Sequence, residues 1–228
     1  MSFSSIIISW PAYLLLEIIV RYLGFIRSTE TDQRQGKPAS VSLFCVLSPG
    51  WSMAYFFKEM IRDVDGYNVK EARGKFIVFN NSGNLLVSAI LFSVPIAIHL
   101  QCQKVPEVVI GFLFWRFLSR SLEISRAFVD DILDTKNESG IDQGVRIKLA
   151  LKSYAEIYIY SAALYSVLSP CLSSFEEATL GSLYVGTLTN ITYVTENIEI
   201  KHLVFVQVFT TLSLIVLSIA GYLSNAKK

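Results

Sequence analysis

Charged residues are scarce in this sequence, and their scarcity indicates the class of protein. Only 17% of the residues are charged, whereas 52% are hydrophobic and 13% are aromatic, and the mean hydropathy is +0.46. An ordinary soluble domain is more polar, and several segments approach the ~20 apolar residues that one bilayer crossing requires. The composition therefore predicts an all-α integral membrane protein.

Histidine and cysteine are too few to support most site chemistry. The two histidines, His99 and His202, lie at predicted membrane borders, without metal-ligand spacing around them. We therefore expect no enzyme activity, no cofactor and no bound metal. Cys45 lies on the predicted cytoplasmic side, whereas Cys102 and Cys171 lie near the outward ends of predicted spans. A disulfide between these two and a pair of free thiols both remain open.

Internal repeats, glycine-rich phosphate loops and basic stripes are also missing, so nucleic acid is not an expected partner. The apolar residues instead gather in five candidate membrane spans. These are Ser5–Ile26, Gly83–Leu100, Val105–Leu118, Ser153–Cys171 and His202–Leu223. Five spans with a re-entrant pore helix and loop before the last one are the predicted architecture.

The third span is interrupted by Arg116 and Arg120, which we expect to snorkel to one interface. Beyond Leu118 the pattern becomes amphipathic as far as Leu133, which predicts a helix at the cytoplasmic interface. With Arg126, the three arginines have uneven spacings. They are too few for a voltage sensor, which needs several gating charges in each subunit.

Three further charges fall inside predicted spans. Glu17 and Arg21 are four residues apart, so they share a helix face and can neutralise each other. Glu156 lies among tyrosines in the fourth span, where Lys152, one turn away, or a tyrosine hydroxyl is its expected partner. Such charges are either folding devices or functional sites.

Basic residues set the predicted orientation. They concentrate between Arg27 and Lys75, between Lys136 and Lys152, and at the end of the chain, whereas the other side holds only Lys104 and Lys201. Because basic links remain in the cytoplasm, we expect a multi-pass protein of the cell inner (plasma) membrane. Its N-terminus is outside and its C-terminus is cytoplasmic.

This orientation divides the chain into four segments. They are the first span (1–26), a cytoplasmic or interfacial layer (27–82), the second and third spans with the amphipathic linker helix (83–134), and a pore-like module (146–224). Within the layer, Val41–Phe57 is apolar enough to span. Pro49 and Gly50 at its centre break a helix and favour two short interfacial helices. A sixth span would place basic residues outside.

Ser173–Leu223 has the layout of a cation-channel pore: a short amphipathic helix, a threonine-rich segment and an apolar span. The threonine-rich segment Thr187–Asn197 reads TLTNITYVTEN, which resembles the pore loop of the potassium-channel superfamily, with its pattern T-x-T-T-V-G-Y-G-D. A gapless register and a register with two inserted residues are both possible. The implied filter residues are Thr189, Asn190, Ile191, Thr192, Tyr193, Val194 and Glu196.

The resemblance covers about eighty residues, from Arg146 onwards, and implies a homotetramer around a central axis. It also implies a pore lined by Gln207, Thr211, Leu214 and Ser218, which share one face of the last helix. The same polar residues also fit simple helix packing. Glutamates on the predicted outer side, from Glu107 to Glu199, favour cations at a pore mouth.

Glycine is absent between Gly186 and Gly221, whereas a potassium filter normally needs glycine to hold its backbone carbonyls in place. The first hypothesis is therefore a weakly selective conductor of inorganic cations. The alternative is a non-conducting, channel-derived sensor or scaffold in the lipid bilayer. It signals to a cytoplasmic protein partner through residues Arg27 to Asn81.

The predicted orientation is testable with impermeant thiol reagents on intact cells. In a background lacking Cys102 and Cys171, a cysteine at Asn197 should be labelled from outside, and a cysteine at Ser139 should not, because the basic links face the cytoplasm. The opposite labelling pattern would invert the topology.

Overall fold

The computed structural model describes residues 3–29, 48–62, 69–100, 104–133, 140–169, 172, 174–197 and 201–225. The regular structure of these residues is helical. The helices are α1 (Phe3–Ser28), α3 (Pro49–Arg62), α4 (Val69–Leu100), α5 (Glu107–Leu133), α6 (Gln143–Leu168), α7 (Phe175–Gly186), α8 (Ile191–Asn197) and α9 (Lys201–Asn225). The prediction of an all-α protein is confirmed for the described part of the chain.

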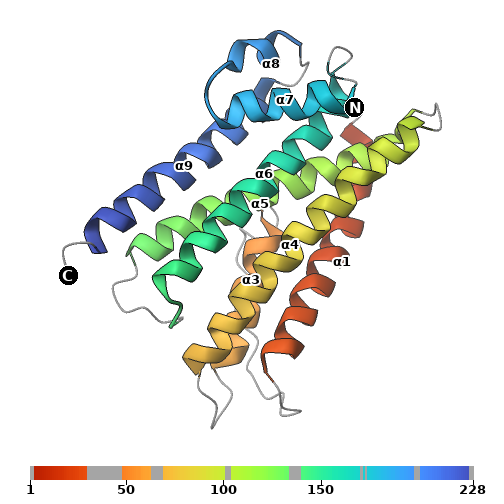
Figure 1. Ribbon diagram of the computed structural model, residues 1–228. Coiled ribbons are helices and arrows are strands. Elements are labelled where there is room, and N and C mark those ends of the chain that lie inside the picture. Colours follow the sequence, from red (N-terminus) through yellow and green to blue (C-terminus); the bar gives the residue numbers. More distant parts are fainter. Residues whose placement is uncertain are drawn as a thin grey trace.

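The long helices α1, α4, α5, α6 and α9 lie side by side in one elongated bundle (Figure 1). The N-terminus, α7 and α8 lie at one end of this bundle. The C-terminus lies at the far end of α9, away from α7 and α8. The short helix α3 packs against α1, α4 and α5. We call the end with α7 and α8 the α7 end, and the opposite end the α3 end.

Local signals explain where several helices begin. Asp142 caps α6 by accepting a hydrogen bond from the backbone N–H of Gly144 at 3.0 Å. Ser174 caps α7 through the N–H of Glu177 at 3.1 Å, and its hydroxyl donates to the Glu177 carboxylate at 2.9 Å. Such a reciprocal cap satisfies donors that the first turn leaves free.

Pro49 is the first residue of α3 rather than a break between two helices. The ring of proline fixes φ near the helical value and its missing N–H costs nothing in the first turn, so this position suits it. The predicted break at Pro49 and Gly50 is therefore a helix start. The upstream half of the predicted interfacial pair, residues 41–47, lies outside the described residues.

The helix α4 is longer than the sequence pattern suggested. The second span was expected to begin at Gly83, but one continuous helix runs from Val69 to Leu100. The expected boundary between the cytoplasmic layer and the second span, at residues 82 and 83, thus falls inside a helix. Hydropathy alone missed this because the first two turns of α4 are polar, and Asn80, Asn81 and Ser82 interrupt the apolar residues that follow.

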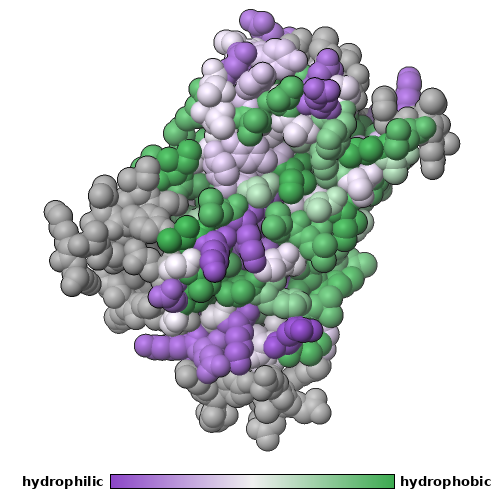
Figure 2. Space-filling view, viewed as in Figure 1, coloured by the Kyte–Doolittle hydropathy of each residue, from purple (hydrophilic) through white to green (hydrophobic). Residues whose placement is uncertain are grey.

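Two described helices are long and apolar enough to cross a membrane, Ser4–Ser28 and Val69–Ile98. Only 28% and 17% of their most apolar stretches are buried inside the protein, so most of each stretch is on the surface. Their outward side chains form part of a broadly hydrophobic face (Figure 2). Extended exposed apolar surface of this kind marks contact with lipid or with another protein.

A glycine in α5 allows α1 and α5 to pack closely against each other. At Gly111 of α5, an added Cβ would lie 2.6 Å from the Ser9 hydroxyl and 2.8 Å from the Ser5 carbonyl oxygen of α1. At Gly83 of α4, the nearest atom would be 3.9 Å away. The two glycines therefore differ in what a methyl group would meet.

We expect Gly111→Ala to lower the free energy of unfolding by about 1–3 kcal/mol, because α1 must move away from α5. Gly83→Ala is the matched control. It should stabilise the protein by up to about 1 kcal/mol, since alanine favours a helix over glycine. Thermal unfolding of both variants in detergent micelles measures the difference. Equal effects would mean that α1 and α5 are not packed this closely.

Candidate functional site

Six charged side chains meet inside the bundle, and we call them the central charge network. They come from α1 (Glu17 and Arg21), α5 (Arg116, Arg120 and Glu123) and α6 (Glu156), and each is buried. Three are acidic and three are basic, so the network is neutral as a whole. Charges removed from water need this kind of pairing, because the desolvation of each lone charge costs several kcal/mol.

Arg120 joins α5 to α6 through two parallel hydrogen bonds. Its Nε and Nη2 atoms donate to the two carboxylate oxygens of Glu156, each at 2.7 Å. The remaining nitrogen of Arg120 pairs with Glu123 on the next turn of α5. A planar guanidinium matches two carboxylate oxygens at once, which makes this the most directional pair of the network.

Arg21 and Arg116 link α1 to α5. The Nη2 atom of Arg21 lies 3.1 Å from Glu17 and 2.6 Å from Glu123. Arg116 pairs with Glu17, donates from Nη2 to Asn84 Oδ1 of α4 at 2.6 Å, and donates from Nε to the Tyr160 hydroxyl of α6 at 2.8 Å. The network therefore ties together four long helices.

All four helices contribute near their midpoints. Arg120 is the middle residue of α5, and Glu17, Asn84 and Glu156 lie within two residues of the middle of their own helices. The polar residues consequently lie at one level near the middle of the bundle. Ionisable groups at the middle of a membrane bundle are costly, and they commonly mark functional sites.

The start of α3 reaches this level. Ser48 is buried and donates from its hydroxyl to the Ser119 carbonyl oxygen at 3.2 Å. An added Cβ on Gly50 would lie 2.6 Å from Oε2 of Glu123 and 3.3 Å from Nη2 of Arg21. Any larger residue at position 50 would therefore displace the carboxylate of Glu123. The positive end of the α3 dipole lies beside the Glu123 carboxylate, which it stabilises.

Two predictions for these charges were wrong. Arg116 and Arg120 do not snorkel to an interface, because carboxylates within the bundle neutralise them where they stand. Glu156 does not pair with Lys152, whose ammonium group donates to Ser82 Oγ of α4 at 2.7 Å. The predicted pair of Glu17 and Arg21 is confirmed.

Sequence reasoning also missed Asn84, Tyr160 and the role of Glu123 in this site. One signal was available: Arg116, Arg120 and Glu123 recur at four- and three-residue spacing, which places them on one face of a helix. A charged helix face in an otherwise apolar chain indicates that this face is buried against polar groups of other helices. The partners on other helices required the tertiary structure.

The pore-like module is held together within a single chain. Gln207 of α9 donates from Nε2 to the Ser182 carbonyl oxygen of α7 at 2.9 Å, and its Oε1 accepts from the Tyr165 hydroxyl of α6 at 2.6 Å. Nearby, the Tyr154 hydroxyl donates to the Gly186 carbonyl oxygen at 3.1 Å. These bonds fix α7 to α6 and α9.

The residues expected to form a filter do not have a filter's backbone. Thr189 and Asn190 are exposed in the connection after α7, and the other five, Ile191 to Val194 with Glu196, belong to the helix α8. Carbonyl groups in a helix point along its axis toward N–H groups of the same helix. The expected extended row of carbonyl ligands is therefore not formed by these residues.

Three of the expected pore-lining residues lie inside the chain. Gln207, Thr211 and Leu214 are buried against other helices of the same chain, whereas residues that line a central axis between subunits would be exposed in one chain. The side chain of Ser218 lies outside the described residues. The exposed face of α9 is apolar and consists of Phe205, Phe209, Leu212 and Val216.

Metal binding finds no support in the described residues, which contain no group of three or more ligating side chains. The thiol question stays open, because Cys45, Cys102 and Cys171 lie outside the described residues. Comparison of this chain with protein families, with curated proteins and with solved structures finds no match.

Removing one partner of the central charge network should be costly. We expect Arg120→Met to lower the free energy of unfolding by about 3–5 kcal/mol, because Glu156 is left buried without its main partner. The control is Arg126→Met on the same helix. It breaks an exposed pair with Asp130 at 3.0 Å, and such pairs contribute about 0–1 kcal/mol.

The double variant Arg120→Met with Glu156→Met should recover part of the loss, since it leaves fewer uncompensated charges. Denaturation in detergent measures all three variants. If Arg120→Met is no more harmful than Arg126→Met, the network does not hold the bundle together.

Proposed function

We propose that this chain is a multi-pass membrane protein whose five long helices all cross the bilayer. Two of them, α1 and α4, are apolar enough by themselves. The charges near the middle of α5 and α6 lie in the central charge network, so these helices need not expose them to lipid. The helix α9 presents a mainly apolar face between Lys201 and Val216.

Within that membrane protein, the function we propose is a non-conducting scaffold or sensor. The observation that carries this proposal is the closure of the pore-like module within one chain. Gln207 is satisfied by Ser182 and Tyr165, and α8 replaces an extended filter. A conducting module would instead keep polar groups free for ions along its axis.

A sensor also needs a physical link between the two sides of the membrane. Here α7 is bonded to α6 through the Ser182 hydroxyl, which donates to the Tyr158 carbonyl oxygen at 2.8 Å. From α6, the link continues through Glu156 and Arg120 to Glu123, beside the start of α3. This continuous chain of contacts supports coupling between the α7 end and the α3 end.

The helix α3 is the natural output of that link. Phe57 and Ile61 of α3 pack into one apolar cluster with Phe25 of α1 and Phe76 of α4. Glu59 of α3 lies 3.7 Å from Arg73 of α4. A movement at the central charge network would therefore reach the α3 end, where the basic residues predict a cytoplasmic location.

A second candidate is the tetrameric, weakly selective cation conductor. It is favoured by the exposed apolar stripe on α9, Phe205 to Val216, which has room for contact with other copies. Acidic residues at the α7 end, such as Glu176 and Glu177, would then attract cations to a shared mouth. In this case the lining would be the exposed stripe rather than Gln207 and Thr211.

Flux measurements with the purified protein in liposomes separate the two candidates. For a scaffold, we expect potassium and sodium fluxes no greater than in protein-free vesicles, whereas added gramicidin opens the same vesicles. Native mass spectrometry of the same preparation reports whether tetramers form.

Paired variants of α9 sharpen this test. Protein-dependent flux that changes with Phe209→Ser, on the exposed stripe, but not with Thr211→Ser, on the buried face, would reject the scaffold in favour of the conductor. Flux that is absent from the wild type and from both variants agrees with the scaffold.

A further inference from the structure

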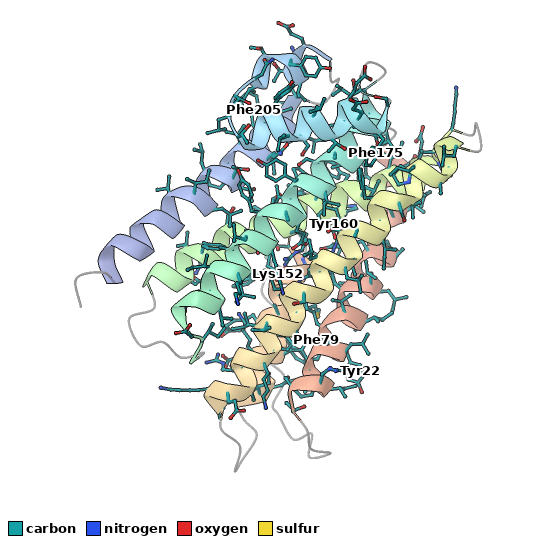
Figure 3. The ribbon with its side chains drawn as sticks, viewed as in Figure 1. Tyr22, Phe79, Lys152, Tyr160, Phe175 and Phe205 are labelled. Carbon is teal, nitrogen blue, oxygen red and sulfur yellow. The ribbon has the colours of Figure 1, made fainter. Side chains whose placement is uncertain are left out.

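A lysine interrupts the hydrophobic face that α4 and α6 share. Figure 2 shows hydrophilic atoms in the middle of this face, and Figure 3 places Lys152 there, between the two helices. Lys152 is half-buried, and its ammonium group is 2.7 Å from Ser82 Oγ. Beside it, Asn81 donates from Nδ2 to Ser153 Oγ at 2.9 Å. We call these four residues the polar notch.

The polar notch lies at the depth of the central charge network. Ser82 is two residues before Asn84 on α4, about 3 Å along the helix axis, and Lys152 is four residues before Glu156 on α6, about 6 Å. Asn84 and Glu156 both belong to the level at which the long helices have their midpoints. The ammonium group therefore lies nearer the middle of the bundle than its ends, whereas the sequence pattern placed Lys152 at the cytoplasmic border of the fourth span.

Groups in the notch are left without full partners. The carboxylate of Glu156, one turn from Lys152, is occupied by Arg120. Within the described part of the chain, Lys152 forms no ion pair, and its hydrogen bond goes to a neutral hydroxyl. The Oδ1 atom of Asn81 is buried and accepts no hydrogen bond there. A cation and an unused acceptor are thus side by side.

Neither lipid headgroups nor a second copy of this chain supplies the missing anion. With the helix midpoints at the centre of the bilayer, as the proposed function places them, a hydrocarbon core about 30 Å thick puts the phosphate groups about 15 Å from that level. In the described part of this chain, the carboxylates at the level of the notch, Glu17, Glu123 and Glu156, are buried in the central charge network. Those on the surface, such as Glu71 and Glu177, lie toward the two ends.

We propose that the α4–α6 face binds a transmembrane helix of a different protein, one that carries an aspartate or glutamate near its middle. The carboxylate pairs with Lys152, and a charge at this depth requires such a partner. Leu86 and Ile90 follow Ser82 at four-residue spacing and are 63% and 54% exposed, so they supply apolar contact around the pair. This inference rests on the proposed function and identifies the class of partner that a scaffold would hold.

A model peptide tests the proposal directly. The probe is an apolar 21-residue transmembrane helix with one central glutamate, and the reference peptide has leucine at that position. Energy transfer between labelled peptide and labelled full-length protein is measured in phosphatidylcholine vesicles at pH 8. We expect the glutamate peptide to bind the wild type about tenfold more tightly than the leucine peptide, as one strong interhelical polar contact provides.

Two variants distinguish a specific pair of Lys152 with the peptide carboxylate from a general effect of positive charge. Lys152→Met should remove the preference for glutamate, whereas Lys148→Met, an exposed lysine one turn earlier on α6, should keep it. Equal binding of the two peptides to the wild type would overturn the proposal. Equal losses in the two variants would also overturn it.

A photoreactive residue at Leu151, which is 63% exposed, identifies the occupant in cells. An adduct with another membrane protein that has a mid-span acidic residue, lost in the Lys152→Met background, supports the proposal. Adducts with only lipid or only a second copy of this chain overturn it.

Extraction of cell membranes with alkaline carbonate tests whether the protein is integral to the membrane. It therefore tests the proposed function separately from this inference. Release of the protein by carbonate would reject the membrane protein itself and the inference with it. Retention of the protein, combined with glutamate-independent peptide binding, would reject only the inference.

Discussion

A charge placed inside an apolar bundle must find its opposite charge there, and the pair of Arg120 and Glu156 meets that requirement at the centre of this protein. The other members of the central charge network extend the pairing to α1, and Arg116 extends it to α4 through Asn84. Helix packing in membranes depends on small residues and polar contacts rather than on hydrophobicity alone. The positions of four helices follow from this one requirement.

The sequence predicted the helical class because helices are encoded by local composition and length. It also predicted the pair of Glu17 and Arg21, since both residues lie on one helix. It failed where a partner lay on another helix: Lys152 or a tyrosine hydroxyl was expected to pair with Glu156, and Arg120 of α5 was not considered. Long-range partners are set by packing, which a single sequence does not display.

The pore-like module shows a second limit of sequence reasoning. The layout of amphipathic helix, threonine-rich segment and apolar span was recovered as α7, α8 and α9. The pattern could not indicate that Ile191–Asn197 would be helical, or that Gln207 would face Ser182 and Tyr165 within the same chain. Spacing placed Gln207, Thr211 and Leu214 on one face of α9, and all three are buried, but only packing decides whether such a face meets a pore or another helix.

Arg120 is synthesised before its partner Glu156, and this order matters while the protein is being made. Glu156 is made 36 residues after Arg120, which at ribosomal rates of 5–20 residues per second is a delay of roughly 2–7 s. The two residues leave the ribosome in the order in which they are made, so Arg120 emerges before its main partner by the same interval. Glu123, one turn further along the same helix, pairs with Arg120 as soon as α5 forms. Glu123 can therefore compensate the charge of Arg120 until Glu156 of α6 packs against α5.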